Sequence, residues 1–240
     1  MVTYLIPCND FNNDLIKTVD SISLEHMVEE ILIINDSSHK IEPKISSMLL
    51  SYSKVKVIKN ISKKGIVGAL NTGIKNIKTE FFARIDSGDI VIGERIKKQY
   101  EYLQLNPEVD LVCSSMLRSD AGTIIPKVSY VNNLISPFSR VPHPTWFCKT
   151  KLFSSLYSET CLRCEDYEIL LRVNPRIGVI YEPFVIYDVE SNLDRKKEFI
   201  SVLHKVRLFF SKTDYSFVGF LVSLSYLVLR CLRITFSRKK

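Results

Sequence analysis

Two aspartates at the end of an aromatic, β-prone run have the residue types and spacing of a metal site. The run at 81–85 is followed at once by Asp86-Ser87-Gly88-Asp89, so the strand-like pattern ends where the carboxylates begin. Mg²⁺ and Mn²⁺ bind carboxylate oxygens and complete their shells with water and substrate phosphate oxygens. Asp, Ser and Gly are also common in solvated β-turns. The segment therefore predicts a divalent-metal site at Asp86 and Asp89, with an ordinary turn as the alternative.

Further polar residues follow two other strand-like runs. Asn9 and Asp10 come after the run at 2–6, and the tetrapeptide NDSS at 35–38 comes after the run at 30–34. The carboxyl ends of parallel strands meet at one edge of a sheet, where loops commonly build a binding site. We therefore expect these side chains to converge with the aspartate loop.

Three glycines interrupt the helical pattern that follows. Gly65, Gly68 and Gly73 lie in GIVGALNTGI, although glycine costs about 1 kcal/mol relative to alanine in a helix interior. We expect that something approaches this backbone closely. The spacing matches neither a P-loop nor GxGxxG, so a nucleotide would be held by side chains and strand-end loops.

A second pair of carboxylates opens a helical run in the second half of the chain. Glu165 and Asp166 begin the apolar pattern of CEDYEILLRV, where the positive end of the helix dipole stabilises ionised carboxylates. A carboxylate placed there can act as a base, or it can simply cap the helix. His143 lies between two prolines, where a supporting role in a loop is the alternative to a direct one.

The elements that position these residues alternate regularly. Strand-like runs lie at 2–6, 30–34, 55–58, 80–85 and 109–113, and helical patterns at about 13–24, 41–52, 65–77 and 93–105. This order is typical of a mostly parallel, doubly wound α/β sheet.

Composition narrows the class of protein. The chain is 46% apolar and 25% charged, which favours a globular fold over disorder. Six cysteines are scattered, and no secretory signal precedes the first strand, so we expect a reducing cytosol. Cys161 and Cys164 have half the spacing of a zinc site, with idle or buried thiols as the alternative.

The last 46 residues carry most of the positive charge. Residues 195–240 have a net charge of +9, against +7 for the whole chain. The apolar stretch at 217–229 is shorter than the roughly 20 residues that span a bilayer, and polar residues recur along it at helical spacing. This predicts an amphipathic helix on an anionic membrane surface. The alternative is a helix packed on the catalytic domain or a second subunit. No nucleic-acid partner is expected, because the charged part lacks interleaved aromatic residues.

Taken in order, these motifs resemble the family 2 glycosyltransferases of the GT-A fold, of the bacterial type found in capsule and lipopolysaccharide assembly. The resemblance runs from about residue 2 to 190. It is carried by LIPCNDFNNDLIKTVDSI, NDSS, GIVGALNTGI, ARIDSGDIVIGERIKKQ, LNPEVDLVCS, HPTWF and CEDYEILLRV.

The resemblance implies a domain organisation. A Rossmann-like catalytic domain would occupy 1–194, with a nucleotide-binding half at about 1–115 and an acceptor half at about 116–194. The C-terminal helical extension would be 195–240.

The resemblance also implies an activity and its residues. The expected reaction is inverting transfer of a sugar from a nucleotide-diphosphate donor to a glycan or lipid-linked hydroxyl, in cell-surface polysaccharide biosynthesis at the inner face of the plasma membrane. Asp166 would be the catalytic base, Glu165 and His143 would lie on the acceptor side, and Asp86 and Asp89 would hold Mn²⁺ or Mg²⁺. The donor contacts implied are Pro7, Asn9, Asp36, Gly65, Asn71, Arg84 and Asp86.

Three positions depart from the family pattern. Gly88 stands where a second aspartate is usual, Leu70 replaces an arginine, and Asn9-Asp10 replace Tyr-Asn. The donor, acceptor, linkage and oligomeric state therefore stay open. The alternative is an inactive GT-A scaffold that binds a nucleotide sugar or glycan without turnover.

Overall fold

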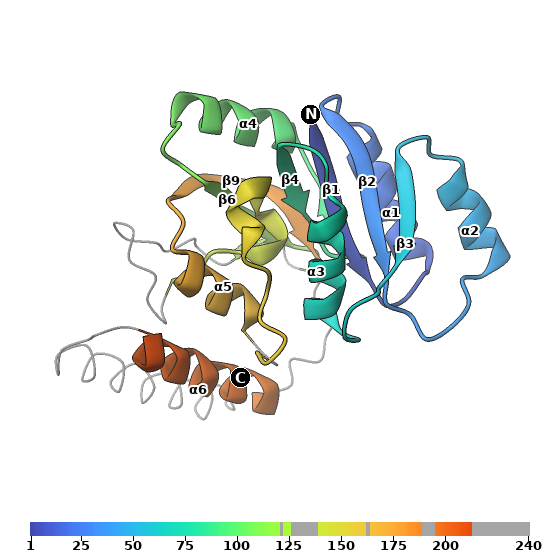
Figure 1. The fold of residues 1–240 in the computed structure, drawn as a ribbon. Coiled ribbons are helices and arrows are strands. Elements are labelled where there is room, and N and C mark those ends of the chain that lie inside the picture. Colours follow the sequence, from blue (N-terminus) through green and yellow to red (C-terminus); the bar gives the residue numbers. More distant parts are fainter. Residues whose placement is uncertain (121, 126–138, 162–163, 189–194, 213–240) are drawn as a thin grey trace.

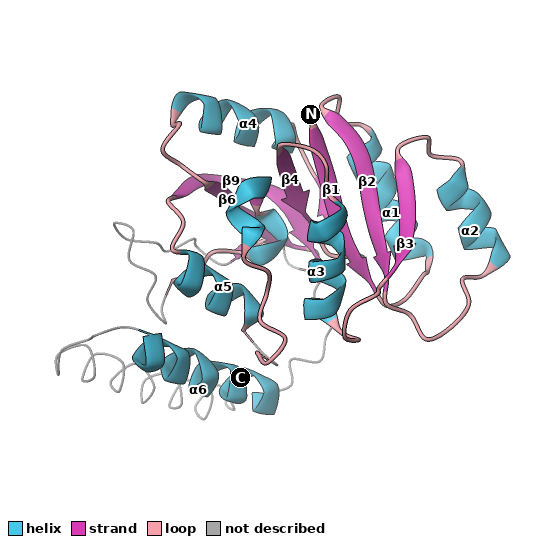
Figure 2. Ribbon diagram, viewed as in Figure 1, coloured by secondary structure: helices cyan, strands magenta, loops and turns pink. Residues whose placement is uncertain are grey.

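The computed structural model describes residues 1–120, 122–125, 139–161, 164–188 and 195–212. These residues form one curled sheet flanked by helices (Figures 1 and 2). The strand order is β3-β2-β1-β4-β8-β6-β9-β5, and β7 pairs with β6 beside this path. The predicted tail at 213–240 lies outside the described residues.

The first half of the sheet is parallel, as predicted. Its strands are β1 (Val2–Cys8), β2 (Val28–Asn35), β3 (Val55–Lys59) and β4 (Phe81–Arg84). Strand β1 pairs in parallel with both β2 and β4, and β2 pairs in parallel with β3. Between them run α1 (Asn13–Ser23), α2 (Pro43–Leu50) and α3 (Ile66–Asn76), followed by α4 (Arg95–Leu105) after β4. Each predicted helix lies within two residues of its observed start and end.

The second half of the sheet is mixed. Strand β8 (Phe147–Lys149) lies antiparallel between β4 and β6 (Leu111–Arg118), so β6 runs in the same direction as β4. Strand β9 (Ile177–Tyr187) is parallel to β6, and β5 (Ile90–Val91) is antiparallel to β9. Short 3-10 helices at His143–Thr145 and Thr150–Ser154 flank β8. The short β7 (Ile124–Ile125) completes the sheet.

Two apolar clusters lie on the two faces of this sheet. Along β1, Tyr4 and Ile6 pack into the cluster with α1, α2 and α4, whereas Leu5 packs into the cluster with α3 and α5 (Glu165–Val173). Strand β1 is therefore buried on both faces, which explains its nearly continuous apolar run.

The last described helix, α6 (Arg195–Lys212), packs on α5. The Cys164 thiol donates to the Ser201 carbonyl at 3.1 Å, and the Lys205 ammonium lies 5.4 Å from the centre of the Tyr167 ring. Among the residues that the structure describes, no helix has the length and apolar character needed to cross a bilayer.

Candidate functional site

The loops at the carboxyl ends of β1, β2 and β4 meet, as predicted. The Asp36 amide donates to the Cys8 carbonyl at 2.8 Å, which joins the loops after β1 and β2. The Cys8 sulfur lies 3.8 Å from the Ser87 hydroxyl, which brings in the aspartate loop after β4. Polar side chains from three separate stretches of chain therefore share one rim of the sheet.

Asp36 ties this rim to the start of α3. Its carboxylate accepts hydrogen bonds from Asn60 Nδ2 at 2.7 Å and from the Gly65 amide at 2.8 Å. Gly65 has φ +114°, a conformation that favours glycine. Because a carboxylate has about four acceptor positions, Asp36 keeps the capacity to accept a further hydrogen bond.

The glycine spacing in α3 has a cause within the chain. A Cβ on Gly68 would lie 1.7 Å from the Lys63 carbonyl oxygen, and one on Gly73 would lie 2.1 Å from Leu5 Cδ1. The close approach expected from the sequence is therefore made by the loop before α3 and by strand β1. No ligand is needed to explain either glycine.

Arg84 places an incompletely paired guanidinium at the end of β4. Its side chain is only 4% exposed, and Nη2 lies 2.8 Å from Asp86 Oδ1. Nε and Nη1 are buried and have no hydrogen-bond partner among the described residues. Burial opposes the charged form, but Asp86, Tyr157 and Glu165 outweigh it and raise the pKa of Arg84 above its ordinary value. Two buried donors on a permanent cation suit an anionic ligand.

Asp89 is the second carboxylate of this loop, and it is 3% exposed. Oδ1 accepts from the Asp188 amide at 3.1 Å, while buried Oδ2 has no partner in the part of the chain that the structure describes. Burial, and then the charge of Asp86, raise the pKa of Asp89 to about 8. A bound cation would stabilise the ionised carboxylate and offset the cost of burying it beside Asp86. The unpartnered Oδ2 therefore fits a divalent metal.

The rest of the loop leaves the metal shell short of protein ligands. Gly88 has φ +102° and open space at its Cβ position. Its amide donates to Thr18 Oγ1 at 3.0 Å, which fixes the turn against α1. No group of three His, Cys, Asp or Glu side chains suited to a metal occurs within the described ranges. Asp86 and Asp89 would need water and substrate oxygens to complete the shell, which is usual for Mg²⁺.

Glu165 and Asp166 lie at the start of α5, close to the aspartate loop. Burial, followed by the neighbouring charge of Asp166, raises the pKa of Glu165, and Arg84 and Asp86 act on the same carboxyl group. Cys164 precedes the helix in the left-handed conformation, with φ 62°. Glu165 and Asp166 are both partly exposed, so either carboxylate is open to solvent or substrate.

Tyr157 organises the acceptor half, although no sequence pattern singled it out. Asn71 Nδ2 donates to the Tyr157 carbonyl at 3.0 Å, and the Tyr157 amide donates to Asn71 Oδ1 at 2.9 Å. The Tyr157 hydroxyl lies 2.8 Å from His143 Nε2. Asn71 and His143, predicted as donor-side and acceptor-side contacts, thus both hold this one buried tyrosine. Local periodicity could not reveal these contacts, because they join residues far apart in the sequence.

Arg95 and Gln99 hold the backbone next to the aspartate loop in place. Both are fully buried, and Arg95 Nη2 donates to the carbonyls of Arg84 at 2.8 Å and Trp146 at 3.2 Å. Gln99 binds the Arg95 Nε and the Thr145 carbonyl. These bonds join the start of the aspartate loop to the HPTWF segment, which gives the Glu-Arg-x-x-x-Gln motif a structural role.

The remaining predicted contacts are placed as follows. Pro7 is buried near the end of β1, and Asn9 is exposed just beyond it. Cys164 is buried, and burial raises the pKa of its thiol to about 11. With its hydrogen bond to Ser201, Cys164 fits a packed thiol better than a zinc or redox site.

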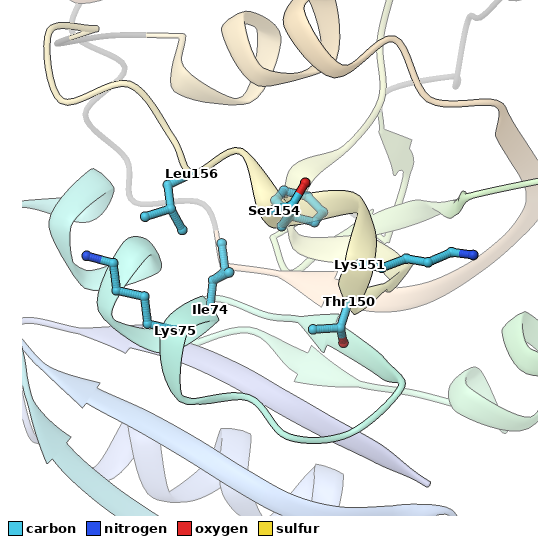
Figure 3. Close-up of a pocket in the computed structure, with 7 residues that line it drawn as sticks. Ile74, Lys75, Thr150, Lys151, Ser154 and Leu156 are labelled. Carbon is cyan, nitrogen blue, oxygen red and sulfur yellow. The ribbon is translucent and has the colours of Figure 1, made fainter.

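A hollow of about 320 Å³ lies away from this rim, between the carboxyl end of α3 and the 3-10 helix after β8 (Figure 3). It is lined in part by Ile74, Lys75 and Thr150. The Thr150 amide binds the Glu80 carbonyl, just before β4 begins. The hollow therefore lies at the amino end of β4, whereas the aspartate loop follows its carboxyl end.

Comparison with known proteins places this geometry in a family. Residues 4–173 match the family described as Glycosyl transferase family 2. The chain is similar to the amylovoran biosynthesis glycosyltransferase AmsE of Erwinia amylovora, with 28% identity over 69% of this chain and 66% of AmsE. It is also similar to the O-antigen biosynthesis glycosyltransferase WbnJ of Escherichia coli, with 31% identity over 44% of each chain. The chain thus spans just under two thirds of AmsE and less than half of WbnJ.

Solved structures share the fold at low sequence identity. TarS from S. aureus, crystallised with UDP, has a TM-score of 0.72 at 17% identity over all of this chain and 73% of the TarS chain. The mannosyltransferase PcManGT from Pyrobaculum calidifontis, in complex with GDP-Man and Mn²⁺, has a TM-score of 0.69 at 14% identity. That alignment covers 94% of this chain and 69% of PcManGT.

Proposed function

The chain belongs to glycosyl transferase family 2 and has the GT-A fold, and from this premise we propose that it transfers a sugar from a nucleotide-diphosphate donor to an acceptor hydroxyl. The observation that carries the proposal is Arg84, a buried cation beside the aspartate loop whose Nε and Nη1 have no hydrogen-bond partner among the described residues. A sugar diphosphate offers the anionic oxygens that such donors recognise.

We assign the residues of the rim to different parts of the donor. We assign Asp36, held by Asn60 and Gly65, to the nucleotide base, and Arg84 with Asp86 to the diphosphate. Asp86 and Asp89 would hold a divalent ion, which when bound supplies Lewis-acid stabilisation of the leaving diphosphate. Pro7 and Asn9 complete the donor side.

Asp166 is the proposed general base of an inverting reaction. The acceptor oxygen forms a bond to the anomeric carbon, the bond from that carbon to the diphosphate oxygen breaks, and the acceptor proton passes to the Asp166 carboxylate. Glu165, whose pKa is raised by burial, stands beside the position that matches the family's catalytic base. We assign it to orienting the acceptor, with Tyr157 and His143 supporting that side.

The relatives and neighbours indicate classes of substrate. AmsE and WbnJ are named for amylovoran and O-antigen biosynthesis, which supports a role in cell-surface polysaccharide assembly. The neighbouring structures are complexes with UDP and UDP-GlcNAc, for TarS, and with GDP-Man, for PcManGT. We therefore propose a uridine or guanosine diphosphate donor and a glycan or lipid-linked acceptor, used at the inner face of the plasma membrane.

A binding scaffold without turnover is the second candidate, and Gly88 is the observation that favours it. With glycine at this position, the loop contributes two carboxylates, Asp86 and Asp89. Weak metal binding would then leave nucleotide recognition intact but slow the departure of the diphosphate.

Calorimetric titration with UDP, GDP and dTDP, each with and without Mn²⁺, tests the proposal. We expect one nucleotide class to bind, with an affinity that Mn²⁺ increases. Arg84→Met should weaken the binding of that nucleotide by about 10–100-fold, because hydrogen bonds to a charged group contribute about 1.5–3 kcal/mol. The same substitution should leave binding of the corresponding nucleoside unchanged. Binding of no nucleotide, or equal loss for nucleotide and nucleoside, would contradict the donor site.

A further inference from the structure

Four lysines surround the rim of the sheet next to the donor site. Lys40 lies in the loop after β2, Lys59 ends β3, and Lys63 and Lys64 lie in the loop before α3; all four are exposed. We call these four residues the basic rim. The two loops are neighbours, since the Lys64 ammonium donates to the Ser38 hydroxyl. Neither 37–41 nor 59–66 contains an Asp or Glu.

Aliphatic side chains stand exposed among these lysines. Ile61 is 77% exposed and Ile66 is 39% exposed. The Ile61 amide is held by Thr72 Oγ1 at 3.3 Å, so the backbone is fixed while the side chain points into solvent. Exposed isoleucine among lysines is typical of segments that enter the boundary between lipid headgroups and acyl chains.

A second segment exposes similar residues on the same side of the molecule. Helix α6 turns Ser201, Lys205 and Phe209 toward α5 and the body. Ile200 and Leu203, each 39% exposed, lie on the opposite stripe of the helix. In Figure 1, α6 and the amino end of α3 both lie on the lower side of the view, with α5 between α6 and the sheet.

We propose that the basic rim, with Ile61 and the outward stripe of α6, seats the carboxyl side of the sheet on an anionic phospholipid bilayer. This proposal rests on the proposed function, because a chain seated in this way would present its donor site to a lipid-linked acceptor at the membrane surface. Attraction of the donor diphosphate would account for the lysines but not for an exposed Ile61. Glu159 lines a hollow with Lys63 and Lys64, and its negative charge offsets part of theirs. We therefore assign the strongest attraction to anionic lipid to Lys40 and Lys59.

Liposome flotation of the full chain tests this surface. The vesicles are phosphatidylcholine, with and without phosphatidylglycerol, and the readout is the partition coefficient. Each basic residue near an anionic leaflet contributes about fivefold to partitioning, so Lys40→Gln with Lys59→Gln should lower it by about 25-fold. Ile61→Ser should lower it by about tenfold without changing the charge. The matched control is Lys78→Gln with Lys151→Gln, two exposed lysines at the amino end of β4.

The outcomes separate this surface from the donor site. Partitioning that falls in the two rim variants and not in the control supports the proposal. Partitioning equal to the wild type in Lys40→Gln with Lys59→Gln would overturn it and assign any membrane binding to other segments. Loss by the lysine variant with no effect of Ile61→Ser would show a purely electrostatic contact and would overturn the part of the proposal that seats Ile61 in the bilayer. Nucleotide calorimetry on the same proteins should be unchanged, so a failed donor site is recognised independently.

Discussion

Asp166 is the residue on which the proposed chemistry depends most directly. It is partly exposed in the first turn of α5, next to Glu165, which is also partly exposed. Asp166→Asn keeps the shape but removes the proton acceptor, so sugar transfer should fall by about 10²–10⁴-fold. Nucleotide affinity, measured by calorimetry, should stay within experimental error. The control is Glu159→Gln, an exposed acid on the preceding loop; transfer by Asp166→Asn at the wild-type rate would remove Asp166 as the base.

Asp89 should make the stability of the metal-free protein depend on pH. Its pKa in the fold is about 8, against an ordinary value of 3.8, so the native state binds one more proton than the unfolded state between these values. The free energy of unfolding should therefore be highest at low pH within this window and fall as pH rises toward 8. The loss is at most about 4 kcal/mol between about pH 5 and pH 9.

Thermal unfolding in chelator across this range measures the effect. Asp89→Asn should remove most of the pH dependence, whereas Asp14→Asn, on an exposed carboxylate, should retain it. Mn²⁺ should restore stability at high pH in the wild type and not in Asp89→Asn. An unchanged pH profile in Asp89→Asn would show that the buried carboxyl group titrates normally.

At the scale of elements, the junction of α3 with its preceding loop connects packing to donor binding. Gly68→Ala would force its Cβ against the Lys63 carbonyl, whereas Gly73→Ala would meet the flexible side chain of Leu5. Both substitutions raise helix propensity equally, so their difference isolates the backbone clash. Gly68→Ala should destabilise by about 1–3 kcal/mol and weaken nucleotide binding, because the displaced loop carries Gly65 and Asn60.

Urea unfolding and calorimetry on both variants make the comparison. Gly73→Ala should lower stability through its contact with Leu5 but should bind nucleotide like the wild type, since Leu5 lies in the sheet interior. Equal nucleotide affinity in the two variants would show that the loop before α3 does not shape the donor site.

Elements in the first half were predictable because their signals are local. The strand at 2–6 was observed as β1 and the helix at 65–77 as α3, since apolar periodicity and glycine placement specify such elements within a short window. The convergence of Asp36 with Asp86 followed from strand direction alone. Tyr157 could not be found this way, because its partners Asn71 and His143 are set by tertiary packing. Asn71, predicted as a donor contact, uses both polar groups of its side chain to bind Tyr157.

The mixed pairing of the second half was also beyond local patterns. Strand β8 has three residues and β5 has two, which is too short for a periodic signal. Their pairing depends on neighbours, with β5 joining β9 across almost a hundred residues. The predicted boundary between the two halves, at about 115, falls inside β6.

At the scale of the whole molecule, the continuous sheet should make the two halves unfold together. Strand β8 joins β4 to β6, and Arg95 binds the carbonyls of Arg84 at the end of β4 and of Trp146 just before β8. Trp146 is the single tryptophan, fully buried in the predicted acceptor half, whereas the nucleotide is expected in the other half. Its fluorescence therefore reports on a region that the nucleotide is not expected to contact.

Nucleotide at a hundredfold excess over its dissociation constant adds about 2.7 kcal/mol of stability, or about 5–10 °C for a chain of this size. We expect the tryptophan midpoint and the calorimetric midpoint to coincide and to shift together by this amount. Arg84→Met, at the same nucleotide concentration, is the control and should show a much smaller shift in both. A calorimetric shift that leaves the tryptophan midpoint in place would mean that the halves unfold separately, in which case donor binding at Asp36 and Arg84 would not stabilise the acceptor half that holds Asp166.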